Sequence, residues 1–199
     1  MKEMMIAILM FLFPVVNPVV MNMVTDSPPL SVSAEKKGAA VKQEVITIIG
    51  DSLTVAVSKS LKQMKNKKIY IDAKVGRQMN ELSSVFQTMK KNNKLGSKLV
   101  IALGTNGPFR IADVQAVINI ARKSGVDSFY VVNVCMQRSW QNTVNQSLSR
   151  LVQKNKKDTQ LIDWYQVSKD QKSYFAADGV HLSKEGQAAF VRLIQKSIA

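Results

Sequence analysis

The sequence predicts an α/β protein in which a five-stranded parallel sheet lies between two layers of helices. Three observations favour this three-layer α/β/α architecture. Short apolar runs rich in β-branched residues alternate along the chain with longer amphipathic stretches. The runs are apolar almost throughout, which is typical of parallel strands buried on both faces. A chain of 199 residues, 46% of them hydrophobic, is long enough for one well-buried domain.

The expected elements follow one another in a regular order. The expected strands are EVITIIG (44–50), KIYID (68–72), KLVIALG (98–104), SFYVVNV (128–134) and QLID (160–163). The expected helices cover 53–66, 79–94, 110–124, 141–156 and 183–198. The chain therefore divides into a membrane-anchor or signal segment (1–24), a flexible linker (25–43) and a folded domain (44–199). In sheets of this kind ligands bind beyond the carboxyl ends of the strands, so the loops that follow the strands are the expected place for chemistry.

The first segment of the chain is expected to meet a membrane. Residues 5–24 carry no charge and are about as long as the hydrocarbon core of a bilayer is thick. Pro14 and Pro18 weaken a regular helix there, although membrane helices tolerate proline. The alternative is a signal peptide, with Lys2 as its positive start and small residues for cleavage at 31–34. We favour the anchor, and either alternative puts the rest of the chain outside the cytoplasm.

The charge of the chain is unevenly distributed. Its net charge of +14 falls entirely within 45–199, because residues 1–44 carry as many acidic as basic side chains. Lysine clusters occur at 65–68, 90–94 and 154–157, where each alone is typical of a solvated helix end. Together they favour attraction to a polyanion. Nucleic acid is not expected, because no aromatic residues are interleaved with the lysines as a stacking platform requires. With the membrane segment in front, an anionic cell envelope is the favoured partner.

Metal and disulfide chemistry are not expected. The chain has one cysteine, Cys135, and one histidine, His181. A single cysteine cannot form an internal disulfide, and this pair is too few for the usual Cys/His zinc site. No acidic cluster offers a carboxylate site for a metal, so we expect no metal and no cofactor. Histidine is the usual general base near neutral pH, so any histidine-based proton transfer must use His181.

Candidates for a nucleophile and an orienting acid lie in two of the loops. Ser52, in GDSL (50–53), stands where the first strand stops and a helix begins. Asp178 precedes His181 by three residues, so one loop can hold the carboxylate against one ring nitrogen while the other ring nitrogen faces Ser52. That is the arrangement of a catalytic triad. The alternatives are an N-cap at Asp51 or Ser52, a turn at Asp178 and a surface position for His181.

Two further loops contain residues suited to stabilising a negative charge. Gly76 follows the second strand, and its amide can approach a substrate oxygen closely; the alternative is a turn glycine with positive φ. Asn106, between two glycines in GTNG (104–107), follows the third strand. Its side-chain amide is a candidate donor to an oxyanion, and a turn role is again the alternative.

These four motifs together carry a resemblance to a known family. Ser52 in GDSL, Gly76, Asn106 in GTNG and His181 in DGVHL match the four blocks of the SGNH (GDSL-type) hydrolase superfamily, whose sheet is flavodoxin-like. The stretches 71–79, 104–109, 138–148 and 161–169 resemble the extracytoplasmic catalytic domain of Oat-type peptidoglycan O-acetyltransferases. The resemblance implies that Ser52 is the nucleophile, His181 the base and Asp178 its partner. It also implies an oxyanion hole formed by the Ser52 and Gly76 amides and the Asn106 side chain.

The sequence departs from that family in two respects. The family's domain usually follows a large multi-span membrane domain, whereas at most one span precedes it here. The chain is therefore expected to be a fragment, a stand-alone version or the partner of a separate membrane acyltransferase. CMQR (135–138) also stands where a proline-containing loop is expected. Near it, Arg138 and Trp140 are weaker candidates for sugar binding, with packing at a helix start as the alternative for Trp140.

The expected function is acetyl transfer outside the cytoplasm, by a membrane-anchored or secreted protein. A small acyl ester donor would acetylate Ser52, and a hydroxyl of peptidoglycan or another cell-wall glycan would accept the group. The first alternative is a secreted carbohydrate esterase or lipase-like hydrolase that uses the same triad. The second is a non-catalytic module that binds wall polyanions.

Overall fold

The computed structural model describes residues 43–199. The predicted membrane-anchor or signal segment at 1–24 lies outside the described residues, as does the predicted linker up to residue 42. Within 43–199, no helix has the length and apolar composition needed to cross a membrane.

The sheet confirms the predicted fold class. Its five strands are β1 (Glu44–Gly50), β2 (Lys67–Ala73), β3 (Lys98–Ala102), β4 (Ser128–Val132) and β5 (Thr159–Ile162). All neighbouring strands pair in parallel, in the order β2-β1-β3-β4-β5. The carboxyl ends of all five strands therefore meet at one edge, with the β1 end between those of β2 and β3.

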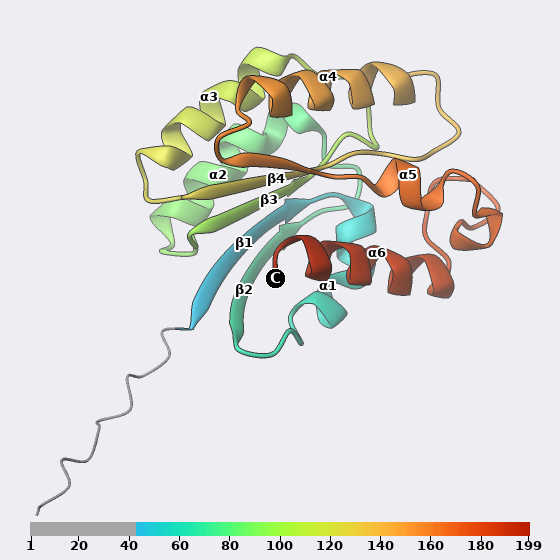
Figure 1. The fold of residues 1–199 in the computed structure, drawn as a ribbon, viewed down its shortest axis with the longest axis horizontal. Helices are drawn as coiled ribbons and strands as arrows, with labels where there is room; N and C mark the ends of the chain where they lie inside the picture. The colour runs from blue at the N-terminus through green and yellow to red at the C-terminus, as the bar shows by residue number, and fades with distance from the viewer. Residues whose placement is uncertain (1–42) are drawn as a thin grey trace, which may run out of the picture. The chain divides into compact units, whose positions relative to one another are not determined.

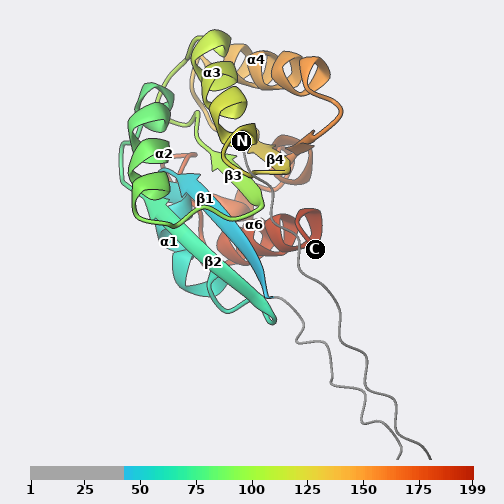
Figure 2. The same ribbon diagram turned by 90° about the vertical axis from the view of Figure 1, so that its left-hand side faces the viewer.

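Helices cover both faces of the sheet (Figure 1). They are α1 (Ser52–Leu61), α2 (Leu82–Lys91), α3 (Ile111–Arg122), α4 (Gln141–Lys154), α5 (Trp164–Ser168) and α6 (Lys184–Ser197), with short 3₁₀ turns η1 (Met79–Glu81) and η2 (Lys172–Tyr174). Helices α2, α3 and α4 pack on one face, and α1 and α6 pack on the other, as the second view also shows (Figure 2). The result is the predicted three-layer arrangement.

Two apolar layers, one on each face of the sheet, form the core. Phe86, Phe129 and Leu148 are fully buried in the layer under α2, α3 and α4. Trp164 and Phe190 are buried in the layer under α1 and α6. Their rings pack edge to face, with the ring centroids 5.1 Å apart. Burial on both faces explains why the strands read as continuous apolar runs in the sequence.

The observed strand boundaries agree with the predicted ones in some strands and differ by two residues in others. Strand β1 has the predicted bounds, whereas β3 and β4 end two residues earlier than predicted. After β4, the Val134 amide donates to Asn145 Oδ1 at 2.9 Å, and Asn145 Nδ2 donates to the Val134 oxygen at 2.8 Å. Because Val134 bonds to this side chain and not to a neighbouring strand, the backbone leaves the sheet there. Helix α5 was not predicted, because five residues are too few to show a helical period. It is capped by Asp163, which accepts the Gln166 amide at 3.0 Å.

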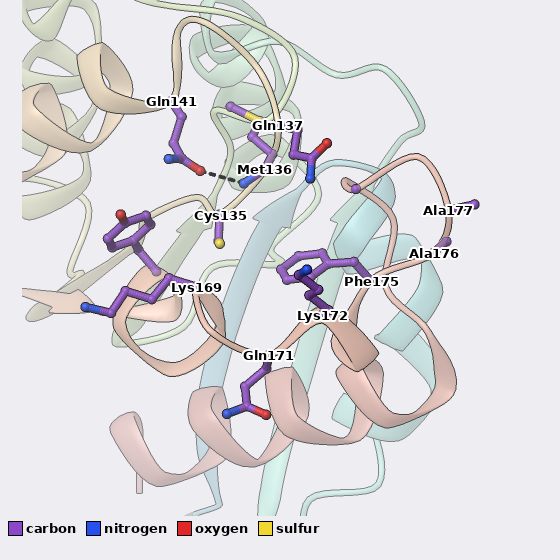
Figure 3. A pocket seen from close by; sticks show the side chains of 12 residues that line it. Cys135, Met136, Gln137, Gln141, Lys169, Gln171, Lys172, Phe175, Ala176 and Ala177 are labelled. Atoms are coloured by element: carbon purple, nitrogen blue, oxygen red, sulfur yellow. Dashed lines mark hydrogen bonds between the residues drawn. The ribbon is translucent and has the colours of Figure 1, made fainter.

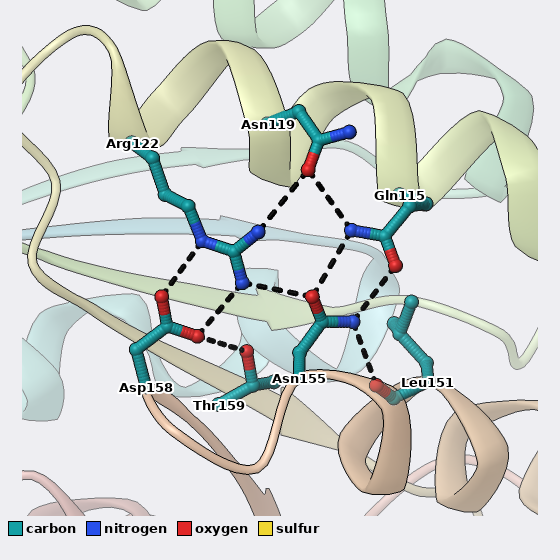
Figure 4. A network of polar contacts seen from close by, with 7 residues as sticks. All are labelled: Gln115, Asn119, Arg122, Leu151, Asn155, Asp158 and Thr159. Atoms are coloured by element: carbon teal, nitrogen blue, oxygen red, sulfur yellow. Dashed lines mark hydrogen bonds and ion pairs between the residues drawn. The ribbon is translucent and has the colours of Figure 1, made fainter.

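A polar network joins α3 and α4 to the loop before β5, at the amino edge of the sheet (Figure 4). Arg122 donates from Nε and Nη2 to the two carboxylate oxygens of Asp158, at 2.7 and 2.8 Å. Asn155 accepts from Arg122 at 2.8 Å and exchanges two hydrogen bonds with Gln115. The network lies at the edge opposite the strand carboxyl ends, so it stabilises the scaffold without contacting the candidate site.

Candidate active site

Ser52 is the first residue of α1, immediately beyond the end of β1. The cap of this helix is Asp51, whose Oδ1 accepts the Leu53 amide at 3.0 Å, so the capping alternative describes Asp51 and leaves the half-buried Ser52 without that role. The helix approaches the strand so closely that a Cβ on Gly50 would lie 2.0 Å from Thr54 Oγ1. Only glycine fits there, and this close approach sets the sharp turn that carries Ser52.

Asp51 is a buried carboxyl group beneath this turn. Only 1% of its surface is exposed, and its Oδ2 has no hydrogen-bond partner within the described part of the chain. Burial raises the pKa of Asp51, while Thr105 and the Leu53 amide act in the opposite direction. Asp51 lines a small cavity together with Asn133. Asp51 therefore stabilises the turn through its hydrogen bond with the Leu53 amide.

Asp178 and His181 are brought together as predicted. Their side chains meet with Asp178 Oδ2 and His181 Nδ1 2.5 Å apart. The other carboxylate oxygen accepts the main-chain amides of Val180 and His181, at 2.9 and 3.0 Å. The bond to His181, followed by the two amides, lowers the pKa of Asp178 well below its usual range. Asp178 is therefore an ionised acceptor at neutral pH, and its bond to Nδ1 leaves His181 Nε2 for a reactant.

The loop that carries this pair is held firmly to the start of α6. The Ala176 amide donates to the His181 oxygen at 2.8 Å, and the Ser183 amide donates to the Tyr174 oxygen at 3.0 Å. Ser183 also caps α6, by accepting the Gly186 amide at 3.1 Å. The imidazole is thus carried on a short hairpin whose two ends are joined by main-chain hydrogen bonds.

Helix packing brings Ser52 and His181 to the same side of the sheet. Helix α1 begins at Ser52, and α6 begins three residues after His181. The two helices pack against each other, and both begin at the carboxyl edge. Among residues 43–199, no hydrogen bond joins the Ser52 hydroxyl to His181. Bonds of this kind are often long in free enzymes and tighten when substrate binds.

Asn106 and the loop of Gly76 are also brought together. Asn106 Nδ2 donates to the main-chain oxygen of Arg77 at 3.0 Å, which joins the loops after β3 and β2. Gly76 has φ +75°, a conformation that favours glycine, so the turn alternative describes its backbone. A Cβ built on Gly76 would meet no atom within 4 Å, so the space beside this residue is open to a ligand.

Arg77 is a site residue that the sequence did not point to. Its side chain is buried and donates to the Gly50 oxygen at 3.2 Å and to the Asp72 oxygen at 2.7 Å. It also forms an ion pair with the Asp72 carboxylate at 2.6 Å. Arg77 therefore ties together the ends of β1 and β2, while its own carbonyl holds Asn106. An arginine beside a turn glycine carries no sequence signal for these long-range contacts.

The two weaker candidates lie on the loop between β4 and α4. Arg138 is exposed, and its guanidinium donates to the Gln137 oxygen at 2.9 Å. Trp140 is partly buried at the start of α4, and its Nε1 donates to the Thr105 oxygen at 3.3 Å. Trp140 thus packs at a helix start, which was the alternative reading of this residue. Sugar binding by Arg138 and Trp140 stays a prediction.

In the described part of the chain, the remaining reactive groups offer no metal site. Within residues 43–199, no cluster of three or more His, Cys, Asp or Glu side chains could hold a metal ion. Cys135 lies half-buried in the loop after β4, where burial raises the pKa of its thiol. A raised pKa keeps the thiol neutral and poorly nucleophilic.

Curated proteins provide clear sequence relatives. The chain is 34% identical over 163 residues to the peptidoglycan O-acetyltransferase OatA of Listeria monocytogenes, a match that covers 80% of this chain and 25% of that protein. It is 31% identical over 160 residues to the O-acetyltransferase OatA of Staphylococcus aureus, covering 79% of this chain and 26% of the relative. The chain thus spans about a quarter of the length of these relatives. No family model matches the chain.

Solved structures share the fold. The C-terminal catalytic domain of Streptococcus pneumoniae peptidoglycan O-acetyltransferase A superposes with a TM-score of 0.64 at 19% identity, covering 78% of this chain and 92% of that domain. A Slackia heliotrinireducens protein assigned as an SGNH hydrolase gives a TM-score of 0.66 at 15% identity, covering 78% and 99%. At such low identities these likenesses establish the fold alone. The chain is therefore a sequence relative of the peptidoglycan O-acetyltransferases, and its residues 43–199 have the α/β fold of the SGNH hydrolases that its motifs predicted.

Proposed function

We propose that this chain is a serine acyltransferase that moves an acetyl group onto a hydroxyl of peptidoglycan through an acetyl-Ser52 intermediate. The observation that carries the proposal is the 2.5 Å contact between Asp178 and His181, on a loop at the same sheet edge as Ser52. The names of the sequence relatives support the acetyl group and the glycan as reactants. Proposed roles follow for Ser52 as nucleophile, His181 as base and Asp178 as its orienting acid.

In the first step, the Ser52 hydroxyl attacks the carbonyl carbon of an acetyl ester. His181 Nε2 takes the hydroxyl proton as the new carbon–oxygen bond forms. The amides of Ser52 and Gly76 and the side chain of Asn106 stabilise the negative carbonyl oxygen. The intermediate collapses to acetyl-Ser52, and the alcohol of the donor leaves with the proton that His181 returns.

In the second step, a glycan hydroxyl attacks acetyl-Ser52. His181 accepts the proton of that hydroxyl, and the same donors stabilise the second tetrahedral intermediate. The bond between the acetyl carbon and Ser52 Oγ then breaks, and the proton passes back to Ser52. The product is an acetylated sugar, with the enzyme regenerated. Asp178 stays ionised throughout and stabilises the imidazolium that forms in each step.

Hydrolysis is the second candidate function, because the site is open to water. The His181 and Asp178 side chains are 55% and 43% exposed, so water can reach the base that activates the second attack. Transfer requires that the sugar hydroxyl occupy that position more often than water does. The chain is then an acetyltransferase in the presence of acceptor and a slow esterase in its absence.

The setting proposed for this reaction is the outer face of the cell envelope. The net charge of +14 favours an acidic wall polymer as the surface on which the protein works. The acetyl donor is proposed to be a small ester or a group delivered by a separate membrane acyltransferase. The proposed attachment through residues 5–24 would keep the domain close to that donor.

Product analysis tests the proposal. The purified 199-residue chain is incubated with a chromogenic acetyl ester, with and without a peptidoglycan oligosaccharide, and the products are identified by mass spectrometry. We expect acetylated oligosaccharide from the parent chain and none from Ser52→Ala. Ser60→Ala, which removes an exposed serine from the same helix, serves as the matched control and should retain activity. Free acetate alone, whatever acceptor is present, would identify an esterase, and no turnover at all would favour the wall-binding module.

A further inference from the structure

A second cavity opens beside the loop of Asp178 and His181 (Figure 3). Its walls come from the β4–α4 loop, from α5 and the turn after it, and from the loop 175–179. Its volume is about 400 Å³, within the range of small-molecule sites. Figure 3 shows side chains reaching it from the β4–α4 side and from the α5 side. None of the roles proposed above uses this cavity.

The cavity is joined directly to the catalytic loop. The Gln137 amide donates to the oxygen of Gly179, the residue that follows Asp178, at 3.3 Å. The Gln137 side chain also lies against this glycine, since a Cβ on Gly179 would be 3.1 Å from Gln137 Cδ. A molecule in the cavity therefore touches the same loop that carries the Asp178–His181 pair. This proximity suits the acceptor, whose hydroxyl must reach His181.

The chemistry of the walls fits a sugar ring that carries a negative charge. Tyr165 and Phe175 present aromatic surface, which packs on the apolar faces of sugars. Lys169 and Lys172 line the same cavity, and neither forms an ion pair with a carboxylate of residues 43–199. Lys169 Nζ stands 5.9 Å from the Tyr165 ring centre, so charge and aromatic surface adjoin. The nearest acid in sequence, Asp170, follows Lys169 but does not line the cavity.

We propose that this cavity binds the acceptor through a sugar unit bearing an anionic group, a carboxylate or a phosphate, with Lys169 and Lys172 as its counter-charges. The inference rests on the proposed function for the identity of the acceptor as a glycan. It deepens that function by assigning the acceptor side of the site to the walls formed by α5 and the β4–α4 loop.

Binding to an inactive chain tests this independently of catalysis. In a Ser52→Ala background, calorimetry measures the Kd of three probes: N-acetylmuramic acid, which carries a carboxylate, N-acetylglucosamine 6-phosphate, and neutral N-acetylglucosamine. We expect the neutral sugar to bind more weakly than at least one anionic sugar. The carboxylate and phosphate arms identify which group the cavity prefers. Lys169→Gln/Lys172→Gln should weaken the preferred anionic sugar about three- to tenfold, because two exposed ion pairs are lost, and should leave the neutral sugar unchanged.

A matched variant separates a local effect from a change in net charge. Lys90→Gln/Lys91→Gln removes the same two charges from the exposed end of α2, away from the cavity, and should leave all three Kd values unchanged. Equal weakening by both double variants, or equal binding of charged and neutral sugars, would overturn the proposal. A different result would overturn only the proposed function: the anionic sugar binds in a way that depends on Lys169 and Lys172, but the parent chain turns over no acetyl ester.

Discussion

The side-chain amide of Asn106 donates a hydrogen bond to the main-chain oxygen of Arg77, with nitrogen and oxygen 3.0 Å apart. This bond joins the loop after β3 to the loop after β2, which carries Gly76. A side-chain amide has two hydrogens, and within 43–199 the Asn106 nitrogen has no second acceptor, so one N–H is left for a ligand oxygen. Donors fixed before the substrate binds stabilise a developing charge without reorganisation. Arg77 is thus the support on which the proposed oxyanion hole is built.

Removing the Asn106 donor should impair catalysis far more than folding. Asn106→Ala should lower kcat for hydrolysis of a chromogenic acetyl ester by about 10²–10³-fold, the usual effect of losing one oxyanion donor. Steady-state kinetics measures this, with urea unfolding as the check on stability. Unchanged kcat in a folded Asn106→Ala chain would exclude Asn106 from the oxyanion hole.

Replacing Arg77 should affect both folding and catalysis. Arg77→Lys keeps the charge but loses the planar fork that bonds Gly50 and Asp72 together. We expect a loss of about 1–3 kcal/mol in the free energy of unfolding, because buried acceptors lose their donors. The loop after β2, whose Arg77 carbonyl holds Asn106, should also shift. We therefore expect kcat to fall by a factor at least as large as any change in KM. Lys74→Ala, which breaks an exposed ion pair with Glu81 nearby, is the control and should cost less than about 1 kcal/mol.

Arg77 also marks the limit of what the sequence predicts. The strands and long helices follow from local patterns, such as the apolar run of β1 that ends at Gly50. The common location of the four loop motifs could also be predicted, because parallel strands bring their carboxyl ends to one edge of the sheet. Arg77 could not be predicted in this way, because its role depends on contacts with a carbonyl 27 residues away in the chain. The cavity lined by the loop 175–179 combines three separate segments and has no sequence pattern either.

Replacing Asp178 tests the orientation of the imidazole. Asp178→Asn should lower kcat by about 10⁴-fold, because the neutral amide cannot hold the same tautomer or stabilise the imidazolium. Since the Asp178 side chain is 43% exposed, losing its ionised form should lower the free energy of unfolding only slightly at neutral pH. A steady-state comparison of the folded variant with the parent measures the effect. Retention of more than about a tenth of the parent kcat would contradict the proposed role.

The same carboxylate predicts how stability depends on pH. The pKa of Asp178 in the folded chain lies below its ordinary value of 3.8, chiefly because of the bond to His181. The ionised form therefore stabilises the fold; this contribution is complete above 3.8 and is lost as the pH falls toward the folded pKa. Urea unfolding at a series of pH values from neutral to acidic should show a shallower loss of stability for Asp178→Asn. An identical pH dependence in both chains would refute this linkage.

Asp158 offers a stability test away from the site. Arg122 lowers the pKa of Asp158 below its ordinary value of 3.8, so this pair also contributes stability above that pH and loses it on acidification. Asp158→Asn should reduce the free energy of unfolding at neutral pH by about 1–2 kcal/mol, since the pair is only partly buried. The activity of the folded chain should be unaffected. A loss of kcat equal to that of Asp178→Asn would show that scaffold damage alone explains both variants.

Trapping the acetyl group on Ser52 tests the proposed acyl-serine mechanism most directly. The full chain is mixed with a chromogenic acetyl ester, quenched in acid during the first turnover, and examined by intact-mass and peptide mass spectrometry. We expect one added acetyl group, located on Ser52, that disappears when a peptidoglycan oligosaccharide is added before the quench and reappears on the sugar. Turnover by the Ser52→Ala chain at the parent rate, or acetyl found only on other residues, would contradict the proposed mechanism.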